Sequence, residues 1–599
     1  MNNKQVYDFG PFRLDPEIRR LLHKGKAVNL MPRAFDLLLL LVQRRPELVT
    51  KEELIKQVWR DQFVEENNLT VLVSGLRKAL GDSYELHEYI ETVARQGYRF
   101  VARVRELTIG EIDEAETDNH ASTLPGISIS PSRQPAISLA VLPFLNESED
   151  PNLEYLSDGI TETLISHLSQ RTSLRVIAST SSFHYKGRGV EPVKVGREIG
   201  VSAVLIGSVV YMGFGLAINL ELVDTSEGTQ IWSQRYAGQM SQLLALEEEI
   251  AGAISEKLQV RFGRSTRQTG NTETTEAYVC YLKGRYFLNQ QQEESMYRAI
   301  KHFEQAIGID PDYALAYAGL ADAYQKLSNI YLSPAEALPK SKSFALKAVE
   351  LDDTLPEAHT ALGVVKQVYD HDWAGAEKEF QRAINLNPND SLAHRKYGVH
   401  LTLIRRYDEG FAESSIAYDL DPLSFQIYVN LALSLFLSRR TDEAVRIVRQ
   451  ALEMDPTYPP AHLMLGTILR EQGKYAEALA EFQEVRRLAK HSDVSLGMSG
   501  HTLALMGDRE GAKKILEELF DRAGKNYVSP YSVALIYIGL GDKDKAFEWL
   551  YKVYQEVNDW LTWLNVGPEL DPLRSDPRFS DLLRRVGFSP ENRRAITSP

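Results

Sequence analysis

NNLTVLVSGLRKALGD, residues 67–82, and YIETVARQGYRF, residues 89–100, decide the fold of the N-terminal part of the chain. Asn67 or Asn68 can cap the start of a helix, and Gly81 can end it. The apolar residues between these caps fall at spacings of 4, 3 and 4, which places them on one buried helix face: Leu69, Val73, Leu76 and Leu80. The first stretch therefore predicts an amphipathic helix, and the second predicts a short hairpin.

The surface of this region is basic and polar rather than acidic. Thr50 and Glu53 have the spacing of a capping box, which starts an earlier helix that runs to about Trp59. The outer or flanking surface of the later helix holds no acidic residue and consists of Asn67, Asn68, Thr70, Val71, Ser74, Gly75, Arg77 and Lys78. The hairpin then adds Arg95, Gln96 and Arg99. Two helices followed by a basic hairpin predict a winged helix-turn-helix, which is an α+β DNA-binding fold.

Residues 6–103 resemble the OmpR/PhoB-type DNA-binding domain, in particular its ToxR-like branch. The resemblance rests on FGPFRLDPEIRRLLHKGKAVNLMPRAFDLLLLLVQRRPELVTKEELIKQVW, then LRKALGD, then IETVARQGYRF. It implies a small N-terminal sheet, three helices, and a C-terminal hairpin whose tip enters the minor groove. By the same resemblance, residues 67–80 lie in the major groove and Arg77 contacts backbone phosphate. Residues 92–98 form the wing, with Arg95 as its groove-entering cation.

One departure from the family pattern bears on base recognition. Some members place arginines where this chain has Ser74 and Gly75, so the readout is expected from Asn68, Thr70, the methyls of Val71 or DNA shape. The full set predicted to contact DNA is Asn67, Asn68, Thr70, Val71, Ser74, Arg77, Lys78, Thr92, Arg95, Gln96 and Arg99. Structural alternatives remain open for some of these residues and for a neighbour: an intradomain salt bridge for Arg77, solvation for Lys78 and Arg99, and a place in the hairpin core for Tyr98.

The length and charge of the chain limit its domain organisation and the partners it can bind. A chain of 599 residues is too long for one core, so several domains are expected. The formal net charge is −14, yet residues 1–105 hold 18 basic and 14 acidic residues, which is +4 for this segment. Only this segment suits a polyanion, and so small a charge favours dimeric or tandem binding. The single cysteine, the absence of a secretory signal and the shortness of the apolar runs predict a cytoplasmic protein.

The rest of the chain divides by composition into three parts. Residues 106–135 hold six acidic residues, one basic residue and no aromatic, which predicts a flexible acidic linker. Residues 136–265 alternate β-rich apolar runs such as SAVLIGSVVYM with helical patterns such as DGITETLISHLSQ, which predicts an α/β domain. Several ordered blocks, from LAVLPFLNESED to GTQIWSQRY, resemble the TolB-like amino-terminal domain.

A catalytic role for the α/β part is the weakest hypothesis. Asp158 and Glu162 are four residues apart, with His167 further along the same predicted helix, and residues 179–182 form a serine- and threonine-rich run near Lys186. No nucleophile elbow, phosphate-binding loop or metal-ligand spacing accompanies them. We therefore interpret them as solvated carboxylates and a turn, and residues 213–218 as a hairpin turn rather than a dinucleotide fingerprint. No catalytic residue, cofactor or metal is predicted, and the chain is not expected to be an enzyme.

Residues 270–590 carry a repeat with a fixed period. Pro388, Pro422 and Pro456 are 34 residues apart, each after a helical pattern, which indicates a helix-turn-helix solenoid. The recurring small, alanine and phenylalanine positions resemble the tetratricopeptide repeat, with about eight or nine helical pairs and a C-terminal segment that caps the last repeat. The resemblance implies a concave surface for a protein or peptide, where first-helix polar residues could contact a partner: Asn430, His462 and Arg470.

Together these patterns predict a multi-domain transcriptional regulator: a winged helix, a TolB-like α/β domain and an all-α tetratricopeptide solenoid. Its expected partners are double-stranded promoter DNA and a protein or peptide on the concave face, with RNA polymerase as one candidate, and no membrane. A homodimer on DNA is also expected. The alternative is a scaffold protein whose winged helix only tethers it to DNA or mediates protein contacts.

Overall fold

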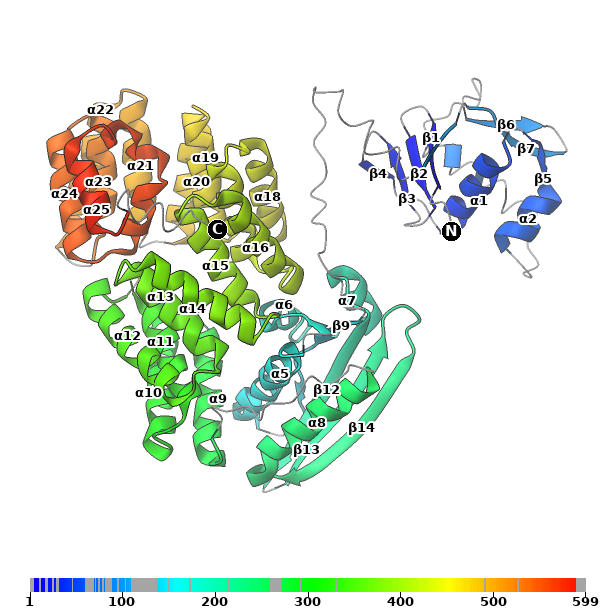
Figure 1. The fold of residues 1–599 in the computed structure, drawn as a ribbon, viewed down its shortest axis with the longest axis horizontal. Helices are drawn as coiled ribbons and strands as arrows, with labels where there is room; N and C mark the ends of the chain where they lie inside the picture. The colour runs from blue at the N-terminus through cyan, green and yellow to red at the C-terminus, as the bar shows by residue number, and fades with distance from the viewer. Residues whose placement is uncertain are drawn as a thin grey trace. The chain divides into compact units, whose positions relative to one another are not determined.

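The structure is a computed structural model that falls into two units, residues 1–132 and 133–599, which are described separately below (Figure 1). It describes residues 5–9, 12–16, 20–23, 26–28, 32–45, 47–59, 69, 72–73, 76–77, 80, 89–93, 96–102, 104–108, 137–148, 150–171, 174–213, 215–258, 272–290, 292–328, 331–489, 492–524 and 527–588.

The first unit opens with an antiparallel sheet. Its strand order is β4-β3-β2-β1-β8. The strands are β1 (Gln5–Phe9), β2 (Phe12–Asp15), β3 (Arg20–His23), β4 (Lys26–Val28) and β8 (Arg105–Thr108). Because β8 pairs with β1 through residue 108, the first three residues of the expected linker belong to this sheet instead. The remaining linker residues lie outside the described part of the chain.

The helical layer and the wing follow. Helix α1 spans Pro32–Gln43, and β5 (Val49–Thr50) leads directly into α2 (Lys51–Trp59). The predicted capping box is confirmed at the start of α2: the Thr50 amide donates to Glu53 Oε2 at 3.1 Å, and the Glu53 amide donates to Thr50 Oγ1 at 3.3 Å. Strands β6 (Ile90–Val93) and β7 (Gly97–Phe100) form the hairpin, and β5 pairs with β7.

The second unit begins with a mixed sheet of order β11-β9-β12-β13-β14, with β10 paired to β12. Strands β9 to β12 run parallel, whereas β12, β13 and β14 form an antiparallel meander. The strands are β9 (Ile137–Val141), β10 (Leu145–Asn146), β11 (Leu174–Val176), β12 (Ala203–Met212), β13 (Gly215–Asp224) and β14 (Gln230–Gln239). The helices are η1 (Pro151–Leu153), α5 (Glu154–Ser169), α6 (Ser179–Phe183), α7 (Pro192–Ile199), η2 (Met240–Gln242) and α8 (Leu243–Lys257). The predicted hairpin turn between β12 and β13 is present, with Gly213 at φ 66°.

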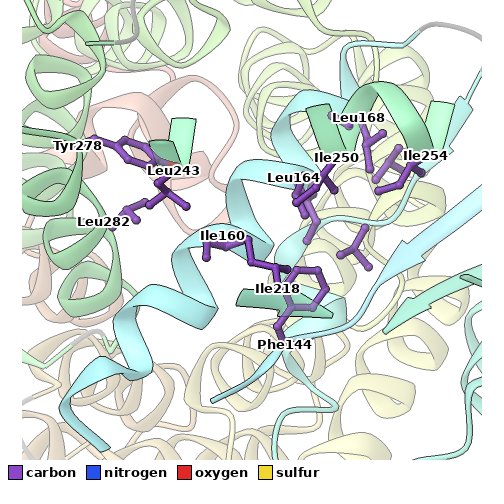
Figure 2. Close-up of a cluster of buried hydrophobic side chains, with 14 of the residues drawn as sticks. Phe144, Ile160, Leu164, Leu168, Ile218, Leu243, Ile250, Ile254, Tyr278 and Leu282 are labelled. Atoms are coloured by element: carbon purple, nitrogen blue, oxygen red, sulfur yellow. The ribbon is translucent and has the colours of Figure 1, made fainter. Parts of the chain in front are cut away.

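The α/β layer and the first solenoid helix share one hydrophobic core. Figure 2 draws Ile160 and Leu164 of α5 together with Tyr278 and Leu282 of α9 (Thr275–Asn289), and all four belong to a single buried cluster. The chain was expected to divide between residues 265 and 270, but residues 133–599 form one compact unit. The apolar face of α5 is covered by α9 as well as by α8, so the solenoid begins on the α/β layer.

A buried polar contact joins three helices in this core. Tyr278 of α9 donates to Glu247 of α8, with its hydroxyl 2.7 Å from Oε2, and lies 2.7 Å from the Thr163 hydroxyl of α5. Glu247 is fully buried, and burial raises the pKa of its carboxyl well above the ordinary value, against the lowering effect of the Tyr278 hydrogen bond. The hydrogen bonds satisfy a group that would otherwise be costly to bury.

The solenoid consists, in the described residues, of eight helix pairs (Figure 1). They are α9 with α10 (Glu293–Ile309), α11 (Ala314–Leu327) with α12 (Pro334–Leu351), α13 (Pro356–Val368) with α14 (Trp373–Leu386), α15 (Ser391–Leu403) with α16 (Tyr407–Leu420), α17 (Phe425–Leu437) with α18 (Thr441–Met454), α19 (Pro459–Glu471) with α20 (Tyr475–Leu488), α21 (Asp493–Leu505) with α22 (Arg509–Ala523), and α23 (Pro530–Leu540) with α24 (Lys543–Gln555). The number agrees with the expected eight or nine pairs.

Within a pair, a small residue on the first helix faces a phenylalanine on the second. A Cβ on Gly466 would meet Phe482 Cε1 at 2.6 Å, so a glycine is needed where α19 and α20 approach. The same arrangement places Phe380 against Gly363. At both positions the small residue lets the second helix approach the first closely.

The C-terminal segment, residues 559–588, runs back along the solenoid instead of only capping its end. It comprises η3 (Asp559–Asn565), η4 (Pro568–Leu573) and α25 (Pro577–Arg585). Elements η3 and η4 contact the first helices α13, α15 and α23, which line the inner face. Near its end, Trp373 Nε1 at the start of α14 donates to the Val586 carbonyl at 2.8 Å. The expectation that this segment caps the last repeat is thus incomplete, because it also reaches the third helix pair.

Candidate nucleic-acid interface and partner surfaces

The helix of residues 67–80 presents the expected buried face. Its described residues Leu69, Leu72, Val73, Leu76, Arg77 and Leu80 are helical. Four of them are buried in the core of the first unit, as the spacing predicted: Leu69, Val73, Leu76 and Leu80. The sequence assigns the opposite face of this helix to DNA.

Arg77 connects this helix to the wing. One of its Nη atoms donates to the Ile90 carbonyl at 2.7 Å and to Thr92 Oγ1 at 2.7 Å. Arg77 is thus held within the domain by hydrogen bonds to β6, and the open alternative of an intradomain salt bridge stays a prediction. These bonds fix the position of the wing relative to the helix, so Arg77 has a structural role whether or not it also contacts phosphate.

The hairpin exposes polar side chains at its tip and buries its aromatic residue. Thr92 and Gln96 are exposed. Arg99 is half-exposed, and its guanidinium lies 3.6 Å from the Glu91 carboxylate across the hairpin. Tyr98 is buried, in agreement with a place in the hairpin core. Gly97 is required here, because a Cβ at this position would lie 2.0 Å from the Val49 carbonyl oxygen.

The other residues predicted to contact DNA lie outside the described part of the chain. These are Asn67, Asn68, Thr70, Val71, Ser74, Lys78 and Arg95. Their assignment to the DNA surface remains a prediction from the sequence.

The three residues assigned to a partner on the concave face are engaged within the solenoid. Arg470 is fully buried, and its guanidinium lies 3.3 Å from Glu569 of η4. His462 Nδ1 lies 2.6 Å from Glu481, and its other ring nitrogen lies 3.0 Å from the Pro456 carbonyl. Asn430 is 9% exposed. A side chain that contacts a partner needs an accessible surface, so the prediction for these residues is corrected. Arg470 binds the C-terminal segment, and His462 joins the two helices of its own pair. Asn430 is buried, and its amide nitrogen has no hydrogen-bond partner among the described residues.

Charged residues that the sequence did not single out line the inner face nearer its beginning. Arg285 of α9, Asp322 of α11, Glu357 of α13 and Lys396 of α15 line a cavity of about 50 Å³. Burial, followed by the neighbouring Arg395, lowers the pKa of Lys396 to about 8. Burial also raises the pKa of Glu357. The nearest sequence signal was the small residue Gly284 directly before Arg285, which in the structure packs against Phe303 of the second helix.

The carboxylates that were considered as catalytic candidates form ion pairs with basic residues rather than an acid-base pair with each other. Lys186 pairs with Asp158 and, at 2.8 Å, with Glu154, and Arg285 lies 3.3 Å from Glu162. Burial, against the opposing effect of Lys186, raises the pKa of Asp158 to about 6. The interpretation of these carboxylates as solvated was wrong, since they tie α5 to the loop after α6 and to α9. The hydroxyl of Ser181 donates to Asp421 at 2.5 Å, which joins α6 to the solenoid.

Comparison with known proteins agrees with this arrangement of a DNA-binding unit and a repeat array. A family profile described as "Transcriptional regulatory protein, C terminal" matches residues 25–100, and one described as "Tetratricopeptide repeat" matches residues 435–497. The chain thus carries a winged-helix domain of the transcriptional-regulator type, followed by a helical solenoid.

Several relatives share larger parts of the chain. It is 24% identical over 530 residues to the Transcriptional regulator HilA of Salmonella typhimurium, covering 86% of this chain and 83% of HilA. It is 34% identical over 100 residues to the Transcriptional activator CadC of Escherichia coli, covering 16% of this chain and 20% of CadC. It is also 30% identical over 368 residues to Putative adenylate cyclase 3 of Rhizobium meliloti, covering 57% of this chain and 62% of that protein. Among the described helices, none combines the length and apolar character needed to cross a bilayer.

Proposed function

We propose that this protein is a sequence-specific DNA-binding transcriptional regulator. The observation that carries the proposal is the winged helix: a helix whose buried face is satisfied by the core, joined through Arg77 to an exposed hairpin. The match of residues 25–100 to the regulatory domain and the regulator names of HilA and CadC support it. In this proposal the helix of residues 67–80 lies in the major groove and the hairpin tip enters the minor groove.

The proposed base readout comes from Asn68, Thr70 and Val71, while Arg77 and the wing residues fix the position on the backbone. Because residues 1–105 carry only +4, two copies bind adjacent half-sites. The α/β part, which resembles the TolB-like domain, and the solenoid serve regulation rather than catalysis. We place the protein in the cytoplasm, where the single thiol of Cys280 would remain reduced.

A protein or peptide partner, for which RNA polymerase is one candidate, binds the inner face at its beginning. The C-terminal segment occupies the inner face at α13, α15 and α23, whereas Arg285 of α9 and Asp322 of α11 lie before these helices and offer both signs of charge. Such a surface favours a partner that also carries both signs of charge.

The test is protection of promoter DNA by the intact protein at near-physiological salt, across the genome of its source. The regulator proposal expects a small number of protected promoters. Binding without sequence preference would overturn it and favour the alternative of a scaffold tethered to DNA.

The role of Arg77 is tested by the salt dependence of DNA binding. Arg77→Ala should weaken binding to all sequences and reduce the slope of log K against log salt by about one unit, since one phosphate contact is lost. Thr92→Val is the matched control: it removes a hydrogen bond of Arg77 to the wing but leaves the slope unchanged. If Arg77→Ala weakens binding without changing the slope, Arg77 acts only by positioning the wing.

A further inference from the structure

A cavity of about 660 Å³ lies on the face of the mixed sheet that α5 and α8 do not cover. Leu205, Leu220 and Tyr236 of β12, β13 and β14 point into the core formed with these helices. Side chains alternate along a strand, so Ile206 and Glu221 point to the opposite face and line the cavity. We call this the sheet-face cavity; its volume lies within the range of roughly 300–1,000 Å³ typical of small-molecule sites.

The sheet-face cavity lies where the order of the parallel strands reverses. Strand β9 pairs with β11 on one side and with β12 on the other, and all three run parallel. Leu142 and Pro143, which directly follow β9, line the cavity together with Tyr185 and Val190, which follow β11 and α6. The carboxyl ends of neighbouring parallel strands at such a reversal are where open α/β sheets bind ligands.

The strand register brings two opposite charges to the floor of the cavity. Glu221 of β13 is paired with Ser233 of β14, and Asn219 is paired with Arg235. Glu221 and Arg235 are therefore diagonal neighbours on one face, and residues in this relation are roughly 7–8 Å apart, with their Cβ atoms somewhat closer. Neither makes an ion pair with another described residue. The two charges are left to interact with solvent or with a ligand.

The wall beside these charges is apolar. Leu142, Pro143 and Val190 line it, and Leu145 is 60% exposed, which is unusual for a leucine in a folded protein. Asn219 Nδ2 donates to Ser208 Oγ at 3.1 Å, which fixes the amide and directs its carbonyl oxygen away from that hydroxyl. The cavity thus combines an apolar wall with one cation, one anion and an oriented amide.

We propose that the sheet-face cavity binds a zwitterion of dipeptide size with an apolar side chain. Its ammonium group pairs with Glu221, its carboxylate pairs with Arg235, and its apolar side chain packs against Leu145. The cavity volume of about 660 Å³ leaves room for two amino-acid residues, and the long side chains of Glu221 and Arg235 can each turn toward one end of such a ligand. This proposal is independent of the DNA-binding function.

The experiment is calorimetric titration of the intact protein with the dipeptide Ala-Leu. Its matched ligands are N-acetyl-Ala-Leu, which lacks the ammonium group, and Ala-Leu-amide, which lacks the carboxylate. Saturable binding of Ala-Leu is expected, with at least tenfold weaker binding of each blocked form. Glu221→Gln should abolish the preference over the acetylated form, and Arg235→Gln should abolish the preference over the amide. Arg197→Gln and Glu227→Gln, on exposed residues outside the cavity, should leave binding unchanged.

Three results would overturn the proposal. The first is no saturable binding of Ala-Leu up to about 10 mM, which corresponds to a negligible affinity. The second is equal binding of Ala-Leu and its blocked forms, and the third is an unchanged preference for Ala-Leu over the blocked forms in both cavity variants. The last result would place the bound dipeptide elsewhere, such as on the inner face of the solenoid. Circular dichroism of each variant establishes that a loss of binding is not a loss of folding.

Discussion

Replacing Glu569 by glutamine tests how the C-terminal segment is held. The carboxylate accepts hydrogen bonds from the Tyr531 hydroxyl and from Trp563 Nε1, each at 2.6 Å, and lies 3.3 Å from the Arg470 guanidinium. The side chains of Arg470 and Glu569 are both 0% exposed. Glutamine keeps the volume of the side chain but removes the charge that balances Arg470.

The expected cost follows from this geometry. Breaking a buried ion pair by removing one partner costs about 3–5 kcal/mol. Arg470 keeps a second partner, Glu471, at 2.9 Å, and that carboxylate is 31% exposed, so the lower end applies. We expect the segment to open about 3 kcal/mol more easily, which is a factor of about 150 in its opening equilibrium.

Native-state hydrogen exchange of residues 559–588 measures this opening directly, and it does not require the whole repeat array to unfold in one step. Asp571→Asn is the matched control in the same segment. It makes the same change of charge at an exposed pair with Arg574, where the cost should stay below about 1 kcal/mol. The double variant Arg470→Met with Glu569→Gln should cost less than the sum of the two single changes. Equal protection in Glu569→Gln and Asp571→Asn, or simple additivity in the double variant, would refute the reasoning.

Two further predictions concern the wing and the shared core. Gly97→Ala forces a Cβ against the Val49 carbonyl, so β5 and β7 must separate; we expect a loss of about 2 kcal/mol in the stability of the DNA-binding unit, measured by urea unfolding. A loss below about 0.5 kcal/mol would mean that the strands adjust freely. The folded-state pKa of Glu247 is raised, so its contribution to stability is present below its unfolded pKa and is lost as pH rises through the folded value. Glu247→Gln should therefore flatten the fall of Tm as pH rises above the ordinary carboxyl pKa of about 4.5, and an unchanged fall would show that other groups cause it.

Local signals in the sequence predicted the winged helix and the repeats well. The Thr50–Glu53 capping box, the buried face from Leu69 to Leu80 and the approach of Phe482 to Gly466 each involve residues that are close in sequence. Their geometry follows from helix periodicity and capping, which one short stretch determines.

Contacts between distant parts of the chain were not predictable in the same way. Arg470 occupies a first helix, where a polar residue is expected to face a partner, but its carboxylate partner is 99 residues away in sequence. No residue close to Arg470 in the sequence indicates that partner. Similarly, the sequence does not distinguish Glu247 from the acidic residues beside it, because its partners Tyr278 and Thr163 lie on other helices. Burial of such groups is decided by tertiary packing, which helix periodicity does not report.

The return of the C-terminal segment to Trp373 restricts how this protein can change its length. Repeat arrays can gain or lose whole units, because each unit contacts only its neighbours. Here the Val586 carbonyl must meet Trp373 of the third helix pair after five further pairs, and Asn565 must meet Leu403. Inserting or deleting one 34-residue unit after Leu403 would shift one end of both contacts by the rise of a repeat. The number of repeats in this part of the chain is therefore fixed by the need to close the loop, and homologues that keep the segment should keep the count.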